Sequence, residues 1–208
     1  LIGTNAGGVS GLGNGTDGIS ARADSLHIGG PGTGEGNVIS GNAGSGVRFT
    51  AFGGVNTVQG NLIGLAPDGV TPLGNAGAGV SVANFSGSNL AVSVGGSGPA
   101  YGNLIAYNGG AGVAVLADGF SRQAAIRGNS IHDNGGLGID LSPSGVTPND
   151  AMDADAGANQ LQNFPVITAV VPQFLATLIQ GTLAGAPSSK FTIDVYANTQ
   201  VDSSGYGE

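Results

Sequence analysis

The sequence predicts an all-β protein in which short parallel strands wind into a coil of stacked turns. Two patterns and one absence support this prediction. The phrase Gly-Asn-x-Ile occurs four times, at 36–39, 60–63, 102–105 and 128–131. A Gly followed by Val or Ile begins at 18–19 and returns after each phrase, at 46–47, 79–80, 112–113 and 138–139. No helical period longer than a turn or two accompanies these repeats, so strands are favoured over helical repeats.

The repeated aliphatic positions predict the core of this coil. Equivalent strands of successive turns stack in parallel at about 4.8 Å, so equivalent side chains lie above one another. We expect one inward column from the phrase isoleucines, Ile39, Ile63, Ile105 and Ile131. We expect a second from Val47, Val80, Val113 and Ile139. About five turns fit the number of copies.

The repeated asparagines predict ladders at the bends of the coil. The phrase residues Asn37, Asn61, Asn103 and Asn129 form one candidate column, and Asn42, Asn75, Asn108 and Asn134 form another. Stacked amides can hydrogen-bond along a column. Asn also tolerates the left-handed conformation that a bend can require. The sequence leaves both explanations open, and both can hold.

The character of the chain changes at about residue 161. Glycine becomes less frequent and apolar runs lengthen at 164–171, 175–183 and 191–196, the last with strict alternation. This pattern predicts antiparallel strands, either the start of a β-sandwich or a sheet that caps the coil. We therefore divide the chain into a coil, 1–160, and a partial β-sandwich or capping sheet, 161–208. Because repeat copies look cut at its start, we expect a fragment of a longer protein.

Composition excludes several classes of function. The net charge is -8, and five Lys plus Arg among 208 residues cannot form the basic surface that nucleic acid or an anionic membrane needs. No cysteine is present, which excludes disulfides and thiolate metal sites. No apolar run reaches the roughly 18 residues of a membrane span. We expect neither nucleic-acid binding nor membrane insertion.

The repeated phrases resemble those of bacterial right-handed parallel β-helix repeat proteins. The segment from Gly138 through 149–159 is similar to the end of such arrays in large exported proteins. The segments 163–166, 197–198 and 204–208 resemble the opening of the immunoglobulin-like β-sandwich that follows them. The resemblance implies a right-handed parallel β-helix and a secreted or cell-surface location. It implies little about activity, because this fold hosts many functions.

Two classes of function remain open. The first is an exported or cell-surface structural or adhesive module that contacts glycans or another surface protein; low charge and few aromatic residues favour it. The alternative is a polysaccharide lyase, glycoside hydrolase or epimerase acting on an acidic polysaccharide. An enzyme of this kind needs clustered carboxylates and a basic group, because general acid and general base must sit together.

The best candidate for such a catalytic patch is Tyr107, His132, Asp133 and Asp140. By repeat alignment Tyr107 lies one turn from Asp133, and Asp140 follows the inward Ile139, so it should face outward. The patch combines an imidazole, a phenol and two carboxylates. The alternative interpretation is a solvated outer face beside a loop. Arg127, five positions before His132, is the nearest basic candidate.

A second candidate site lies between the two predicted parts. Asp150, Asp153, Asp155 and Asn159 place oxygen ligands at nearly alternate positions, with a glycine nearby. Such ligands suit a hard cation, and we expect Ca²⁺ to be the ion. The alternative interpretation is an acidic polar linker. No other cofactor is predicted.

Overall fold

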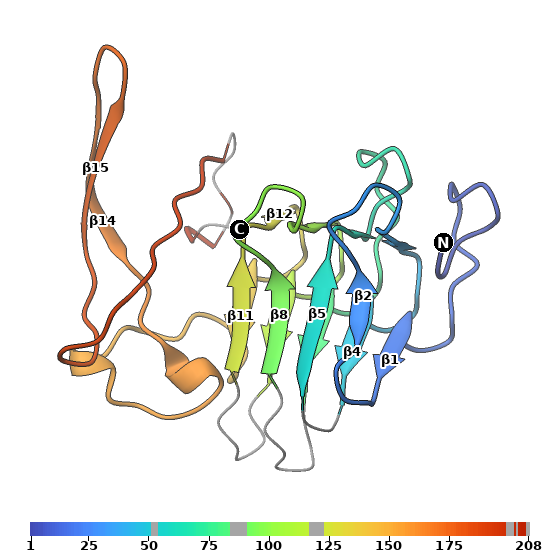
Figure 1. The fold of residues 1–208 in the computed structure, drawn as a ribbon, viewed down its shortest axis with the longest axis horizontal. Helices are drawn as coiled ribbons and strands as arrows, with labels where there is room; N and C mark the ends of the chain where they lie inside the picture. Colours follow the sequence, from blue (N-terminus) through green and yellow to red (C-terminus); the bar gives the residue numbers. More distant parts are fainter. Residues whose placement is uncertain (51–53, 84–90, 117–122, 199–201, 203, 207–208) are drawn as a thin grey trace.

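The computed structural model describes residues 1–50, 54–83, 91–116, 123–198, 202 and 204–206. Within these residues the chain forms three parallel β-sheets and one antiparallel strand pair, with two short 3₁₀ turns and no α-helix. The three sheets lie together in one body, from which the antiparallel pair projects (Figure 1). The expected all-β class is confirmed.

Thirteen strands of the described chain make up the three parallel sheets. The first sheet holds, in spatial order, β1 (Ile19–Ala21), β4 (Val47–Phe49), β7 (Val80–Val82), β10 (Val113–Val115) and β13 (Ile139–Leu141). The second holds β2 (His27–Gly29), β5 (Val55–Gln59), β8 (Ala91–Gly95) and β11 (Gln123–Arg127). The third holds β3 (Val38–Ile39), β6 (Leu62–Ile63), β9 (Leu104–Ala106) and β12 (Ser130–His132).

The chain visits these sheets in a fixed cyclic order. Each strand is followed by one in the next sheet, and it pairs in parallel with the strand three places later. We call one passage through all three sheets a circuit, and the whole, residues 1–141, the three-sheet region. This arrangement is consistent with a parallel β-helix.

Both predicted aliphatic columns are confirmed. Ile39 pairs with Ile63, Ile63 with Ile105 and Ile105 with Ile131, and the first three are fully buried. Val47, Val80 and Val113 are likewise in register and fully buried. Ile139 continues their column but is 45% exposed, because β13 is the last strand of its sheet. The interior of the three-sheet region is therefore built from repeated positions.

Both predicted asparagine ladders are confirmed as well. In the first, each of Asn37, Asn61 and Asn103 donates its backbone N–H and its Nδ2 to the Oδ1 of the next Asn, at 2.8–3.1 Å. The second is longer than predicted, because it begins at Asn14 and then runs through Asn42, Asn75, Asn108 and Asn134. Each ladder thus joins successive circuits through amides, which are buried at the inner rungs.

The segment after β13 closes part of the core. It contains the short turns η1 (Ala151–Asp153) and η2 (Asn159–Leu161). Ala158 is fully buried in the same apolar cluster as the aliphatic columns. Asn159 accepts a hydrogen bond from Ala124 N (2.7 Å) and donates one to Ala124 O (2.9 Å), so its amide satisfies the edge of β11. This segment acts as a cap on the second sheet.

The C-terminal part only partly matches its prediction. The expected antiparallel strands are β14 (Val166–Pro172) and β15 (Thr177–Thr182), which form a ribbon that extends from the cap (Figure 1). Most of its residues are exposed on both faces. The prediction of a third strand at Phe191–Tyr196 was wrong, because these residues form no strand. They instead run beside the end of β11, attached through their side chains.

Candidate functional site

His132 and Asp133 form a hydrogen-bonded pair where β12 ends. The Nδ1 of His132 lies 2.8 Å from Asp133 Oδ2, and the two side chains are 41% and 61% exposed. A carboxylate at Nδ1 orients an imidazole and leaves Nε2 available as a proton acceptor. The pair has the local geometry of a general base, held at the surface rather than in a cleft.

Tyr107 joins this pair, as the repeat alignment predicted. Its ring meets the His132 ring edge-on, with centroids 6.2 Å apart, and its backbone N–H donates to Asp133 O. Tyr107 and Asp133 both have positive φ, of 60° and 55°. The equivalent position two circuits earlier holds Gly41, with φ 74°. Residues with side chains thus occupy a bend that suits glycine, at a cost of about 1 kcal/mol for each.

Asp140 faces outward as predicted, but its carboxylate is engaged elsewhere. It accepts hydrogen bonds from Ser144 Oγ and Gly145 N, both at 3.1 Å. It is in register with Ala114, Ser81, Arg48 and Ser20 along the first sheet. In the described part of the chain, the patch therefore consists of a compact Tyr107–His132–Asp133 group and a separately bonded Asp140.

The acidic residues of the cap come together. Asp150, Asp153 and Asp155 each place a carboxylate oxygen within 4.8 Å of the others. Asp153 accepts a hydrogen bond from Asn163 N, and Asp150 accepts one from Ala154 N. Three carboxylates this close repel one another unless a proton or a cation intervenes.

Two oxygens of this cluster have no partner. Asp150 Oδ1 and Asp155 Oδ1 are shielded from solvent and make no hydrogen bond within the described residues. Buried polar atoms are normally satisfied, so such a pair requires an explanation. Carboxylate oxygens at this separation fit the ligand chemistry of a hard divalent cation. Asn159, the fourth predicted ligand, is instead bonded to Ala124 on β11.

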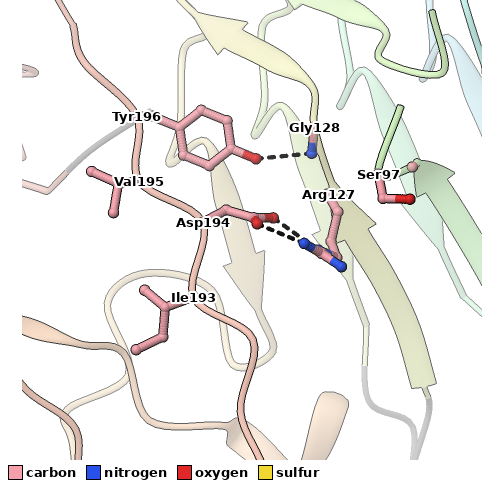
Figure 2. Close-up of a pocket in the computed structure, with 8 residues that line it drawn as sticks. Ser97, Arg127, Gly128, Ile193, Asp194, Val195 and Tyr196 are labelled. Carbon is pink, nitrogen blue, oxygen red and sulfur yellow. Dashed lines mark hydrogen bonds and ion pairs between the residues drawn. The ribbon is translucent and has the colours of Figure 1, made fainter. Parts of the chain in front are cut away.

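A third site was not predicted from the sequence. Arg127, the last residue of β11, donates from Nε and Nη2 to the two carboxylate oxygens of Asp194, at 2.8 and 2.6 Å. The neighbouring Gly128 N–H donates to Tyr196 Oη at 2.8 Å. Figure 2 shows both acceptors pointing toward β11 from the same segment. They border an open pocket of about 330 Å³.

The charges of this third site stabilise each other. The hydrogen bond from Arg127 holds the pKa of Asp194 below its ordinary value, and the same bond raises the pKa of the Arg127 guanidinium. The two side chains are 31% and 39% exposed, so water and salt screen the interaction. Arg127 and Asp194 are 67 positions apart, and their contact occurs once instead of in every repeat. No periodic pattern in the sequence could therefore have predicted it.

Comparisons of the chain with family models, with curated proteins and with solved structures gave no match. No helix in the described residues has the length and hydropathy of a membrane span. The function must therefore be argued from the geometry alone.

Proposed function

We propose that this chain is a structural or adhesive module of an exported or cell-surface bacterial protein. In this proposal residues 1–160 are a right-handed parallel β-helix of about five turns. Residues 161–208 begin an immunoglobulin-like β-sandwich or a capping sheet. The module holds a rigid outer surface toward glycans or toward another surface protein.

The observation that carries this proposal is the continuity of the two asparagine ladders. Side-chain amides link successive circuits from Asn37 to Asn129 and from Asn14 to Asn134, and the inner rungs of both ladders are buried. Each hydrogen bond contributes about 1 kcal/mol net. A body reinforced along its whole length suits a spacer or display surface. The low share of charged residues, 9%, also fits a surface that presents hydroxyl and amide groups.

A panel of acidic polysaccharides tests the proposal. The protein is incubated with each glycan, and unsaturated products and new reducing ends are measured beside binding by glycan array. If the chain is a structural or adhesive module, it should bind a subset of these glycans or none of them, and no product should form. Product formation from any polysaccharide of the panel would instead favour an enzymatic function.

The alternative is a polysaccharide lyase, glycoside hydrolase or epimerase, and the His132–Asp133 pair favours it. If product forms, His132→Ala should reduce the rate by about 10²- to 10⁴-fold, the usual contribution of a general base. His27→Ala is the matched control, because His27 is exposed and bonds Thr57 within the second sheet, whereas His132 lies in the third. Equal rates for the two variants would remove His132 from the mechanism.

We also propose that the cap binds Ca²⁺ through Asp150, Asp153 and Asp155. The two buried oxygens without partners support this proposal. The ion would neutralise the cluster and tie the cap to the start of the ribbon, a structural rather than catalytic role. Asn159 is not needed as a ligand, since its amide is already paired with Ala124.

Calorimetry after chelation tests the cation site. The chelated protein should release or take up heat on addition of Ca²⁺, and its unfolding temperature should rise. Asp155→Asn should abolish both effects. Asp68→Asn is the control, because Asp68 bonds only its own loop, at Val70 and Thr71. No heat and no thermal shift in the unaltered chain would remove the proposal.

A further inference from the structure

The end of β11 presents two hydrogen-bond donors side by side. The Arg127 guanidinium supplies a planar fork, and the Gly128 backbone supplies a single N–H. A fork of this kind matches the two oxygens of a carboxylate, which a point charge such as Lys does not. We call these two groups the Arg127–Gly128 corner. Its donors select an acidic group with a second acceptor nearby.

The acceptors come from an extended segment of the chain, residues 191–196. Asp194 and Tyr196 lie two positions apart, so in an extended backbone their side chains point to the same side. Figure 2 shows this arrangement: both face the corner, whereas Ile193 and Val195 point away from it. The corner therefore contacts a carboxylate and, two residues later, a phenol of one extended segment.

This segment is held by few contacts. Among the described residues, no backbone-to-backbone hydrogen bond joins 191–196 to the three-sheet region. Ile193 and Val195 are 56% and 61% exposed, so little apolar area is buried on attachment. In the described part of the chain, residues 191–196 reach β11 through one exposed ion pair and one hydrogen bond. Such an attachment is reversible, and it leaves the donors intact when it opens.

We propose that the Arg127–Gly128 corner is a peptide-recognition site that Asp194-Val195-Tyr196 occupies in cis. The trans ligand is an extended acidic peptide that carries a carboxylate and, two residues later, a phenol. An open pocket of about 330 Å³ lies between the corner, Ser97 and this segment, so the segment does not fill the surface beside the corner. The proposal does not depend on the function proposed above.

The test uses the full chain with its own segment released. Asp194→Ala and Tyr196→Phe together remove both acceptors and leave the corner free. The probe is a fluorescent peptide with the sequence of residues 190–197, Lys-Phe-Thr-Ile-Asp-Val-Tyr-Ala. The double variant should bind it saturably, and the unaltered chain should bind it more weakly, because a tethered competitor acts at high effective concentration.

Two controls show whether the corner itself binds. Adding Arg127→Gln to the double variant should weaken binding by about ten- to a hundredfold, the value of hydrogen bonds to a charged group. A peptide with Asn in place of Asp should lose affinity to the same degree. Equal binding of the Asp and Asn peptides would overturn the proposal, as would no binding by a folded double variant.

If the double variant does not fold, a second measurement on the unaltered chain tests the proposal. The unlabelled peptide is titrated into the ¹⁵N-labelled unaltered chain, and the signals of Gly128 N–H and Arg127 Nε are followed. Both should shift in a saturable manner, and neither should respond to the Asn peptide. If both signals stay fixed at millimolar peptide, the corner is a structural contact only.

Discussion

At the scale of single residues, the ladder asparagines perform several tasks at once. Asn103 accepts two hydrogen bonds from Asn61, donates to Asn129, and donates to Val58 O at 2.7 Å. Its backbone N–H also donates to Asn129. One side chain therefore links its own circuit to the circuit before it and to the circuit after it. This explains why the phrase keeps Asn while its third position varies among Val, Leu and Ser.

We predict that Asn103→Ala destabilises the protein by about 2–4 kcal/mol. The substitution removes the acceptor of the Asn61 backbone N–H and the side-chain donor to Val58 O, at about 1–3 kcal/mol for each buried group before relaxation. Asn61 Nδ2 keeps its bonds to Ile28 O and Gln59 O. Urea unfolding followed by circular dichroism measures the change. Asn14→Ala is the matched control, because Asn14 is exposed at the open end of the other ladder and should cost under about 1 kcal/mol.

The residues that sequence analysis could predict are those that repeat. Ile39 and Val47 were placed correctly because their equivalents recur at the same place within each repeated phrase, and stacked circuits bring equivalent positions into contact. Asn159 and Asp194 could not be placed in the same way. Each meets its partner once, across 35 and 67 positions, and an isolated contact leaves no periodic trace. Tyr107 and His132 met because they occupy repeat positions of adjacent circuits.

At the scale of elements, the phrase glycine sets the distance between circuits. A Cβ on Gly102 would lie 2.1 Å from Gly128 O, on the backbone of the next circuit. Carbon and oxygen cannot approach so closely, so the stacked backbones would have to separate. The glycine is therefore required by packing between strands rather than by the local turn alone.

We expect Gly102→Ala to destabilise the three-sheet region by about 1–3 kcal/mol, the range of overpacking in a closely packed interior. Chemical denaturation provides the measurement. Gly15→Ala serves as the control, because a Cβ there meets nothing within 4 Å, and its effect should be within about 0.5 kcal/mol. A Gly102 variant as stable as the Gly15 variant would show that the circuits can move apart freely.

The segment Phe191–Tyr196 shows the limit of pattern reasoning for elements. Its alternation is correct for a strand, and Asp194 and Tyr196 do face one side (Figure 2). A strand also needs a partner edge, however, and the cap residue Asn159 already occupies the β11 backbone at Ala124. The segment is consequently attached through Asp194 and Tyr196 instead of through its backbone.

This attachment should depend on pH. The folded pKa of Asp194 is lowered, so the ion pair favours attachment above the ordinary Asp pKa and the contribution disappears as pH falls through the lowered value. The Gly128 N–H signal in NMR spectra should therefore shift at acidic pH and stay constant near neutrality. An Asp194→Asn variant should lack that transition. High salt should shift the same signal, since the pair is partly exposed.

At the scale of the whole molecule, the three sheets end differently. The β11 edge is closed by Asn159 and the core beneath it by Ala158. The column of the first sheet instead ends at Ile139, which is 45% exposed. The ribbon beyond the cap carries no charged residue from 156 to 189 and exposes Phe174 and Leu175 at its tip. Stability therefore depends on the cap, whereas the ribbon adds exposed apolar surface.

A pair of truncations separates these contributions. A chain ending at residue 164 keeps Ala158, Asn159 and the Asn163 bonds to Asp150 and Asp153. It should unfold cooperatively at nearly the same urea concentration as the full chain and should aggregate less, because the exposed ribbon is gone. A chain ending at residue 150 opens the core and leaves Ala124 N and O unpaired.

The shorter chain should lose about 2–4 kcal/mol, from one buried methyl group and two hydrogen bonds to a strand edge together with the unpaired groups that remain. Equilibrium urea denaturation of the two chains, each against the full chain, measures the difference. The cap is the decisive element if only the chain ending at 150 is destabilised. If the chain ending at 164 loses as much, the stability of the three-sheet region depends instead on the ribbon and on residues 191–196, and a boundary near residue 160 is wrong.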